Sequence, residues 1–289
     1  MRSFFSRVRA PRWKWVLAAC LLFSALLLCI ALLPAREAAL PVLMYHHIGD
    51  ETTSDMVVSP ARFEEQMAAL TEGGWHSVTM EQLIGFVEDG TPLPSKSVLI
   101  TFDDGYTSNL ELAAPILEQY GQHGVIFVIG INAGQKYYVH SGTPLTPARF
   151  ALTDALPYLE LGVLELQSHT YDLHQLASYE ISGRDGVLPL SGESEADYTD
   201  ILTRDIQLQQ ALFVRELDCG ITALAYPFGF SCPEAEDIFT QAGIQVTFTT
   251  EPGNNTLVRG QPESLLQLNR YTVTDRMAAE DLLWLLDQP

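Results

Sequence analysis

Two adjacent carboxylates follow an apolar run at residues 98–102 (VLITF) of the 289-residue chain. The run is typical of a buried strand, and Asp103 and Asp104 stand at its end, directly before Gly105. Like charges side by side at such a place repel each other and are costly to desolvate. A cation beside the two carboxylates would offset this repulsion. The alternative is an ordinary turn, in which an aspartate accepts hydrogen bonds from backbone amides.

Two histidines follow another apolar run, in the stretch ELQSHTYDLHQ at residues 165–175. His169 and His174 are five residues apart, which on a helix would point them roughly 140° apart, too far around the axis to share an ion. In a loop after a strand, the same spacing can fold back onto one cation. Two neutral imidazoles and a carboxylate leave open positions on Zn²⁺ or a similar ion, as in hydrolytic sites. We therefore expect a divalent metal, with Zn²⁺ preferred, bound by Asp104, His169 and His174. Asp103 is left as the free base.

These residues can meet only if the elements that carry them lie side by side. Short apolar stretches alternate with amphipathic ones seven or eight times, which predicts parallel β/α units. Strands are predicted at 41–48, 97–103, 124–130, 163–169, 222–228, 245–250 and 265–273, with a weaker one at 75–79. Helices are predicted at 60–72, 80–88, 106–120, 146–158, 194–217, 232–242 and 275–288. The expected fold is α/β, a single distorted (β/α) barrel of about seven parallel strands whose carboxyl ends share one rim.

Four of the predicted helices have a recognisable start. Proline at the first helical position and the capping-box pattern both mark a helix amino terminus. The four signals are Ser59-Pro60, Thr79 with Gln82, Thr146-Pro147, and Ser231 with Glu234.

The first 34 residues differ in character from the rest. All five basic residues before position 35 lie in a segment without acids, and an uncharged apolar run follows at 15–33. This run is long enough for a helix that crosses a bilayer. A cleaved signal peptide is the alternative, but residues 34–38 offer no clean cleavage site. The positive head places the amino terminus in the cytoplasm and the remainder outside the cell membrane. The expected parts are a basic head at 1–14, a single-pass transmembrane anchor at 15–34, a linker at 35–40 and a catalytic domain at 41–289.

The charge of the remainder excludes nucleic acid as a partner. Of the 16 Lys and Arg residues, 11 follow the head, against 36 Asp and Glu, which gives a net charge of −25. Cys219 and Cys232 flank a predicted strand whose ends would lie roughly 23 Å apart. Bridged Cα atoms lie within about 7 Å, so no disulfide is expected. We expect a monomer.

The chain resembles the polysaccharide deacetylases of carbohydrate esterase family 4 over about residues 40–275. TFDDG at 101–105 is similar to the family's first motif, in which the first aspartate is the base and the second binds metal. SHTYDLH at 168–174 resembles its histidine motif, and the interval of five resembles the branch that acts on poly-N-acetylglucosamine. AYPFG at 225–229 resembles a third motif, which implies that the Phe228 backbone N–H is an oxyanion donor.

Two positions depart from the family pattern. Ala225 stands where the family commonly has an arginine that steadies the catalytic aspartate, and Arg270 is a candidate to supply that charge. The segment LQLNRYTV at 266–273 lacks the histidine that commonly serves as general acid. In the poly-N-acetylglucosamine branch the histidine of the opening Tyr-His pair takes this role, and His46 matches it.

The expected function is therefore metal-dependent removal of N-acetyl groups from an N-acetylglucosamine-type polysaccharide of the cell envelope or extracellular matrix. Two alternatives stay open. One is a catalytically impaired carbohydrate-binding relative, because the common arginine and histidine are missing. The other is a metal hydrolase of small amides or esters on the same fold.

Overall fold

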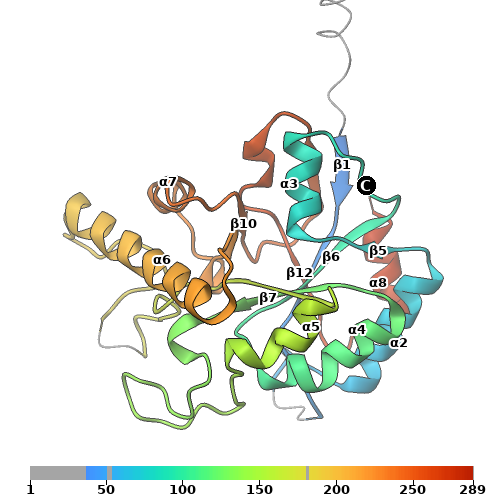
Figure 1. Cartoon of the computed structure of the whole chain (residues 1–289), viewed down its shortest axis with the longest axis horizontal. Coiled ribbons are helices and arrows are strands. Elements are labelled where there is room, and N and C mark those ends of the chain that lie inside the picture. Colours follow the sequence, from blue (N-terminus) through green and yellow to red (C-terminus); the bar gives the residue numbers. More distant parts are fainter. Residues whose placement is uncertain (1–36, 51–53, 180–181, 289) are drawn as a thin grey trace, which may run out of the picture. The chain divides into compact units, whose positions relative to one another are not determined.

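Strand β6 (Ser97–Phe102), which leads to the two aspartates, lies inside a curled parallel sheet. The structure is a computed structural model that describes residues 37–50, 54–179 and 182–288. The sheet has the order β10-β9-β8-β7-β6-β2-β12, and every neighbouring pair is parallel. The other strands are β2 (Val42–Tyr45), β7 (Gly124–Val128), β8 (Leu164–Ser168), β9 (Ala223–Ala225), β10 (Val246–Phe248) and β12 (Tyr271–Thr272). The expected α/β class and parallel strands are confirmed (Figure 1).

The segment before β12 connects the two edges of the curled sheet. Leu268 forms a parallel bridge with Phe248 of β10, and Tyr271 pairs with Leu43 of β2. The Leu268 N–H donates to the Thr247 carbonyl, and its own carbonyl accepts from the Thr249 N–H. This contact joins the edges with a short stretch of hydrogen bonds, which agrees with the distorted barrel expected from the sequence.

Most of the helices cover the outside of this sheet (Figure 1). The helix at 80–88 is the exception, since its buried side chains Leu83 and Phe86 pack with those of the inner face. The helices are α2 (Pro60–Glu72), α3 (Met80–Glu88), α4 (Ala114–Tyr120), α5 (Leu156–Glu160), α6 (Glu195–Leu217), α7 (Pro233–Gln241) and α8 (Ala279–Leu286). A π-helical turn, η1 (Asn109–Ala113), precedes α4, and 3-10 turns occur at η2 (Gly130–Asn132), η3 (Leu152–Ala155), η4 (Pro227–Gly229) and η5 (Pro262–Leu265). Helices α2 and α3 have the predicted bounds. Their caps also form, with Ser59 accepting from the Arg62 N–H and Thr79 with Gln82 forming a capping box.

Two helix predictions were wrong in part. The helix expected at 146–158 begins only at η3, because residues 148–150 pair with the turn after β6. The Thr107 N–H donates to the Ala148 carbonyl, and Tyr106 and Arg149 form an antiparallel bridge. The capping box predicted for α7 is also absent, since its amino-terminal cap is Cys232, whose side chain makes no cap hydrogen bond.

Two small pairings were not predicted, and a third involves the weaker strand predicted at 75–79. Strand β1 (Glu37–Leu40) pairs antiparallel with β11 (Asn255–Val258), so residues 37–40, expected within a linker, join the folded unit. Strand β3 (His47–Ile48) pairs with β4 (Val57–Val58), and β5 (His76–Ser77) pairs with β6.

The expected head and transmembrane anchor lie outside the described residues. Among the residues that the structure describes, none of the helices combines the length and apolar character needed to cross a bilayer. Cys219 and Cys232 are both free, as predicted.

Alternation along β6 decides which way the aspartates point. Val98, Ile100 and Phe102 belong to the buried cluster that packs against the outer helices, whereas Leu99 belongs to the second cluster, inside the curl. Successive residues of a strand face opposite sides, so Thr101 and Asp103 share the inner face with Leu99.

Candidate metal centre

The two aspartates diverge because the chain turns sharply after Asp103. Asp103 continues the inner face of β6, and its N–H still donates to the Tyr45 carbonyl of β2. Asp104 and Gly105 then adopt φ values of 73° and 70°, in the left-handed region that glycine tolerates and aspartate rarely enters. This turn carries the Asp104 side chain sideways, so that the neighbouring carboxylates have different partners. Both are buried.

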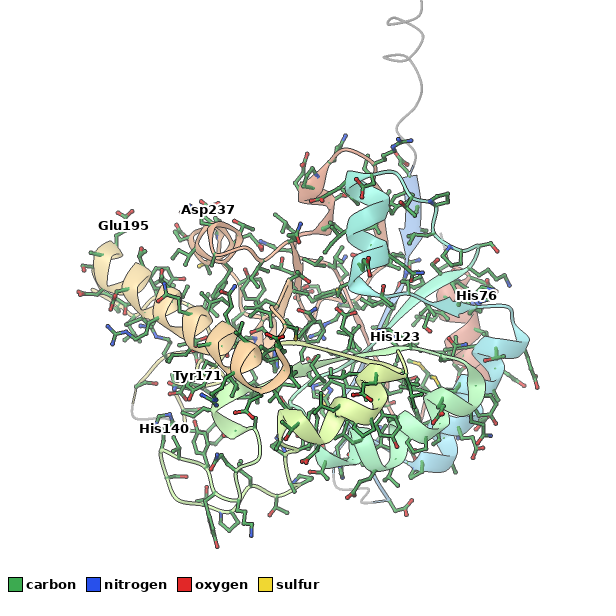
Figure 2. The ribbon with its side chains drawn as sticks, in the orientation of Figure 1. His76, His123, His140, Tyr171, Glu195 and Asp237 are labelled. Atoms are coloured by element: carbon green, nitrogen blue, oxygen red, sulfur yellow. The ribbon has the colours of Figure 1, made fainter. Side chains whose placement is uncertain are left out.

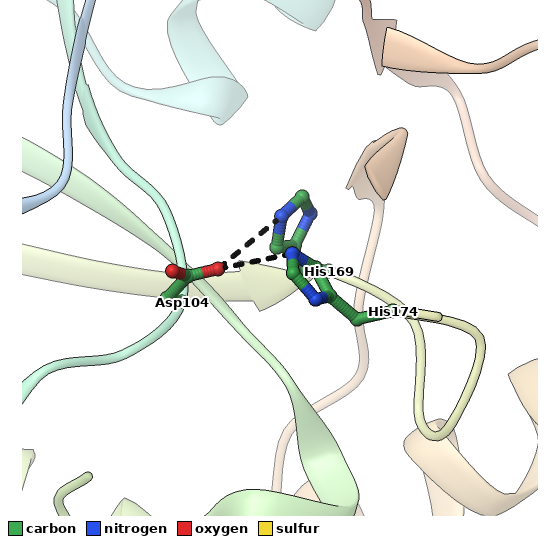
Figure 3. Close-up of side chains that lie close together, drawn as sticks. All are labelled: Asp104, His169 and His174. Atoms are coloured by element: carbon green, nitrogen blue, oxygen red, sulfur yellow. Dashed lines mark ion pairs between the residues drawn. The ribbon is translucent and has the colours of Figure 1, made fainter. Parts of the chain in front are cut away.

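Asp104, His169 and His174 form a cluster suited to a metal ion (Figure 3). Oδ1 of Asp104 lies 3.3 Å from Nε2 of His174 and 3.7 Å from Nε2 of His169. This oxygen is buried and has no hydrogen-bond partner. Nδ1 of His169 lies 2.7 Å from the Ala225 carbonyl, to which it can only donate, so its Nε2 is left as a lone-pair donor. A divalent cation fits an orphaned carboxylate oxygen between two imidazole nitrogens.

Electrostatics keep these groups in the protonation states that bind metal. Burial lowers the pKa of His174 to about 4, despite the nearby charge of Asp104. Burial by itself would raise the pKa of Asp104, but the charges of His174 and Arg149 outweigh it and hold the pKa well below its ordinary value. At neutral pH the carboxylate is therefore ionised and the imidazole is neutral.

Asp103 is paired with Arg270, the residue on the segment that joins the edges of the sheet. Both guanidinium NH groups donate to the carboxylate, each at 2.7 Å, and Arg270 is fully buried. Nε of Arg270 donates to the Thr249 carbonyl, and the guanidinium lies near the rings of Phe127 and Phe248. Burial acts to raise the pKa of Asp103, but Arg270 outweighs it, so the net pKa is lowered and the group stays ionised.

His46 faces Asp103 from the residue directly after the neighbouring strand β2. Its Nε2 lies 4.0 Å from Oδ2 of Asp103, and its backbone carbonyl accepts from Asn109. Burial lowers the pKa of His46, partly offset by the charges of Asp103 and Asp104. His47 points elsewhere, with Nδ1 at 2.7 Å from Oγ of Ser108.

Phe228 reaches the same site from the turn after β9. Its φ of 58° lies in the left-handed region, and its ring packs against that of His174 at 4.4 Å between centroids. The N–H groups of Gly229 and Phe230 donate to turn carbonyls. Among the turn and loop hydrogen bonds of the described residues, none has the Phe228 N–H as its donor.

Arg149 is a site residue that the sequence did not reveal. Its guanidinium stacks at 3.6 Å over the ring of Tyr106, donates to the Pro147 carbonyl, and places NH2 3.7 Å from Oδ2 of Asp104. Each aspartate therefore has its own arginine. Arg149 falls inside the helix that the sequence predicted at 146–158, and no local motif marks it as a site residue.

The comparisons with known proteins agree with this fold. Residues 90–247 match the model of the polysaccharide deacetylase family. The chain belongs to this family and is a hydrolase that acts on amide bonds.

The individual relatives share only a modest sequence identity with this chain. YxkH of Bacillus subtilis (strain 168), which carries a provisional polysaccharide deacetylase name, is 29% identical over 244 residues, covering 84% of this chain and 74% of that protein. The poly-beta-1,6-N-acetyl-D-glucosamine N-deacetylase of Escherichia coli (strain K12) is 25% identical over 226 residues. That match covers 72% of this chain and only 33% of the enzyme. The solved de-N-acetylase from Aggregatibacter actinomycetemcomitans shares the fold with a TM-score of 0.72 at 21% identity, covering 86% of this chain and all of that one.

Proposed function

We propose that this protein uses a divalent metal to remove N-acetyl groups from an N-acetylglucosamine-type polysaccharide of the cell envelope or extracellular matrix. One observation carries the proposal. The orphaned Asp104 oxygen faces the Nε2 atoms of His169 and His174, and a second ionised carboxylate, Asp103, stands 3.9 Å from Nε2 of His169. A carboxylate and two imidazoles that share one space, with a free carboxylate beside them, form a hydrolytic donor set.

The residues around this site have different roles in amide hydrolysis. A metal held by Asp104, His169 and His174 would act as a Lewis acid, Zn²⁺ being the preferred ion. Asp103 accepts a proton from the water whose oxygen attacks the acetyl carbonyl carbon. The Phe228 N–H donates to the carbonyl oxygen as negative charge develops there.

His46 completes the reaction at the leaving group. The carbon–nitrogen bond breaks, and the proton that Asp103 took from the water passes through His46, whose Nε2 lies 4.0 Å from Oδ2 of Asp103, to the departing nitrogen of the sugar. One water and one acetamide group are consumed, and acetate and a free amino sugar are formed. Arg270 does not need to reach the substrate, since its contribution is to keep Asp103 ionised and correctly oriented.

Support for the polymeric substrate comes from the relatives and from charge. The Escherichia coli relative is named for poly-beta-1,6-N-acetyl-D-glucosamine. Its name suggests the same class of polymer for this chain. A strongly acidic protein is compatible with a neutral substrate whose product is cationic.

The pairing of Arg270 with Asp103 favours an active enzyme over an impaired carbohydrate-binding relative. The expected weakness of such a relative is an unsupported catalytic aspartate, and here a buried arginine supports it. A metal hydrolase of small amides or esters remains the second candidate, because the same donor set would serve either substrate.

Acetate release measured on a panel of substrates tests the proposal. The purified full-length chain is incubated with poly-N-acetylglucosamine, peptidoglycan, chitin oligomers and a small acetamide, with and without chelator. We expect release from a polymer, loss of release with chelator, and recovery on addition of Zn²⁺. Release that is unaffected by chelator contradicts the metal site. Release from the small acetamide alone supports the second candidate.

The membrane attachment and the extracytoplasmic location of the catalytic domain also stay predictions. The basic head and the apolar run at 15–33 support them.

A further inference from the structure

Asp205 is a buried carboxylate outside the group of residues that meet at the metal centre. It lies on α6 with 5% of its surface exposed. No ion pair involves it among the described residues, and its neighbour Arg204 lies at the surface, paired with Asp200. A buried carboxylate without a cation is costly unless hydrogen bonds satisfy it. Its two oxygens therefore need hydrogen-bond donors as partners.

Those partners belong to the loop between the two histidines. Oδ2 of Asp205 accepts from the Tyr171 N–H at 2.8 Å, and Oδ1 accepts from the Asp172 N–H at 2.7 Å. Figure 2 shows Tyr171 beside α6. Burial raises the pKa of Asp205 to about 7, while these two N–H donors act in the opposite direction by favouring the form in which both oxygens accept. Asp205 therefore holds two successive peptide groups of the segment that leads from His169 to His174.

The other side of the same loop is fixed by backbone. The Gly130 and Ile131 N–H groups donate to the carbonyls of Thr170 and Tyr171 at 3.1 and 2.8 Å. Thr170 has a φ of 67°, and its hydroxyl accepts from the Leu173 N–H. The loop is therefore held between η2 and α6. On the α6 side, the carboxylate of Asp205 accepts both hydrogen bonds from its peptide groups.

We propose that Asp205 is a positioning residue of the metal centre. It hydrogen-bonds to the peptide groups of Tyr171 and Asp172 and not to the metal-binding side chains. By doing so it sets the path of the loop, so that His174 reaches Asp104 although it lies five residues after His169. The carboxylate is required because it presents two acceptors to two adjacent N–H groups. An asparagine in the same rotamer would present one oxygen and turn an NH₂ group toward the other N–H. This inference rests on the metal site of the proposed function.

Zn²⁺ titration of the metal-free, full-length protein tests it. We expect Asp205→Asn to raise the Kd for Zn²⁺ by about 10- to 100-fold, as is usual when a group that orients a ligand is lost. Asp200→Asn is the matched control, because it removes one negative charge from an exposed position on the same helix. Its Kd should be that of the wild type. Asp205→Glu keeps the charge but displaces both oxygens, so it should also bind Zn²⁺ more weakly if the asparagine variant does not fold.

A double-mutant comparison separates positioning from a structural role. If Asp205 acts through His174, then adding Asp205→Asn to His174→Ala should weaken Zn²⁺ binding no further. A structural residue would instead lower the Tm and leave the Kd of the single variant unchanged, and that result overturns the inference. If His174→Ala itself binds Zn²⁺ normally, the metal site of the proposed function is wrong. Weak binding by His174→Ala with normal binding by Asp205→Asn and Asp205→Glu overturns only the role of Asp205.

Discussion

The guanidinium of Arg270 and the carboxylate of Asp103 meet in two parallel hydrogen bonds of 2.7 Å, in the interior of the curled sheet. They are 167 residues apart in the sequence. The pair explains how a carboxylate can stay ionised at a buried strand end. Arg270 supplies the positive charge for which the family commonly uses an arginine at the position of Ala225.

Replacing Arg270 with methionine should destabilise the protein strongly. The variant leaves Asp103 buried and unpaired, which costs about 3–5 kcal/mol of unfolding free energy. Urea unfolding at pH 7 measures this loss. Arg276→Met is the control, because Arg276 is exposed and pairs with Asp55 at the surface, and it should change stability by less than about 0.5 kcal/mol. Equal small effects in both variants would contradict a stabilising role for the buried pair.

The same pair makes stability depend on acid. The pKa of Asp103 is lowered in the folded protein, so its contribution is present above the unfolded pKa of about 3.9 and is lost as the pH falls through the folded pKa. In Arg270→Met the pKa of Asp103 should rise. The variant has no such contribution to lose, so the difference in unfolding free energy between the wild type and Arg270→Met should shrink as the pH is lowered from 7 toward the folded pKa of Asp103, as measured by urea unfolding.

The two aspartates should respond differently to the same substitution. Asp104→Asn should weaken Zn²⁺ binding, because a neutral amide is a poorer ligand. Asp103→Asn should keep the metal but reduce acetate release by about 10²- to 10⁴-fold, the usual cost of a lost general base. Metal analysis and rate measurements on both variants check this. Metal loss in Asp103→Asn with retention in Asp104→Asn would reverse the two roles, and mild equal effects would indicate a structural turn.

His46→Gln should separate proton donation from metal binding. His46 lies near Asp103 rather than among the three metal-binding side chains, so the variant should bind Zn²⁺ normally. Its rate of acetate release should fall by about 10²- to 10⁴-fold. His47→Gln provides the comparison from the adjacent position, where a large fall in rate would point to the wrong histidine.

The metal-free protein should lose stability between pH 6.5 and pH 4 because of His174. Its folded pKa is about 4, and its unfolded pKa is about 6.5. Between these values the unfolded chain binds more protons, so stability falls as the pH is lowered through this window. Between pH 7 and pH 5, the wild type should lose about 1–2 kcal/mol more than His174→Gln. Urea unfolding in chelator measures both, and equal losses would show that His174 titrates normally.

The amino-terminal prediction can be tested by fractionation. Expressed whole, the protein should stay with membranes after washing with high salt and at alkaline pH, because an apolar span is held by lipid and not by charge. A mature soluble form that begins near Glu37 would indicate a cleaved signal peptide instead.

Local sequence patterns predicted the elements well and the loops poorly. The bounds of α2 and α3 followed from Ser59-Pro60 and from Thr79 with Gln82, because caps act within one turn of the helix. The expected strand-end cluster of Asp104, His169 and His174 followed from the rule that parallel strands end at one rim. These are regularities that a short stretch of sequence contains.

Arg149 and Asp205 could not be found in this way. Arg149 reaches the site because residues 148–150 pair with the turn after β6, and this pairing overrides the helical pattern that begins at Thr146. Asp205 lies in the middle of an amphipathic helix, where an acidic residue is ordinarily solvent-exposed. Its partners are peptide groups, which no side-chain pattern encodes.

The connection between β10 and β2 has a consequence for the order of events in folding. The segment 268–272 both joins the two edges of the sheet and carries Arg270, so the base gains its cation only when this late segment docks. Burying Asp103 without this segment would leave an uncompensated carboxylate, which costs several kcal/mol. Contacts across so long a stretch of chain are also slow to form. We therefore expect catalytic competence and completion of the fold to depend on the same docking step.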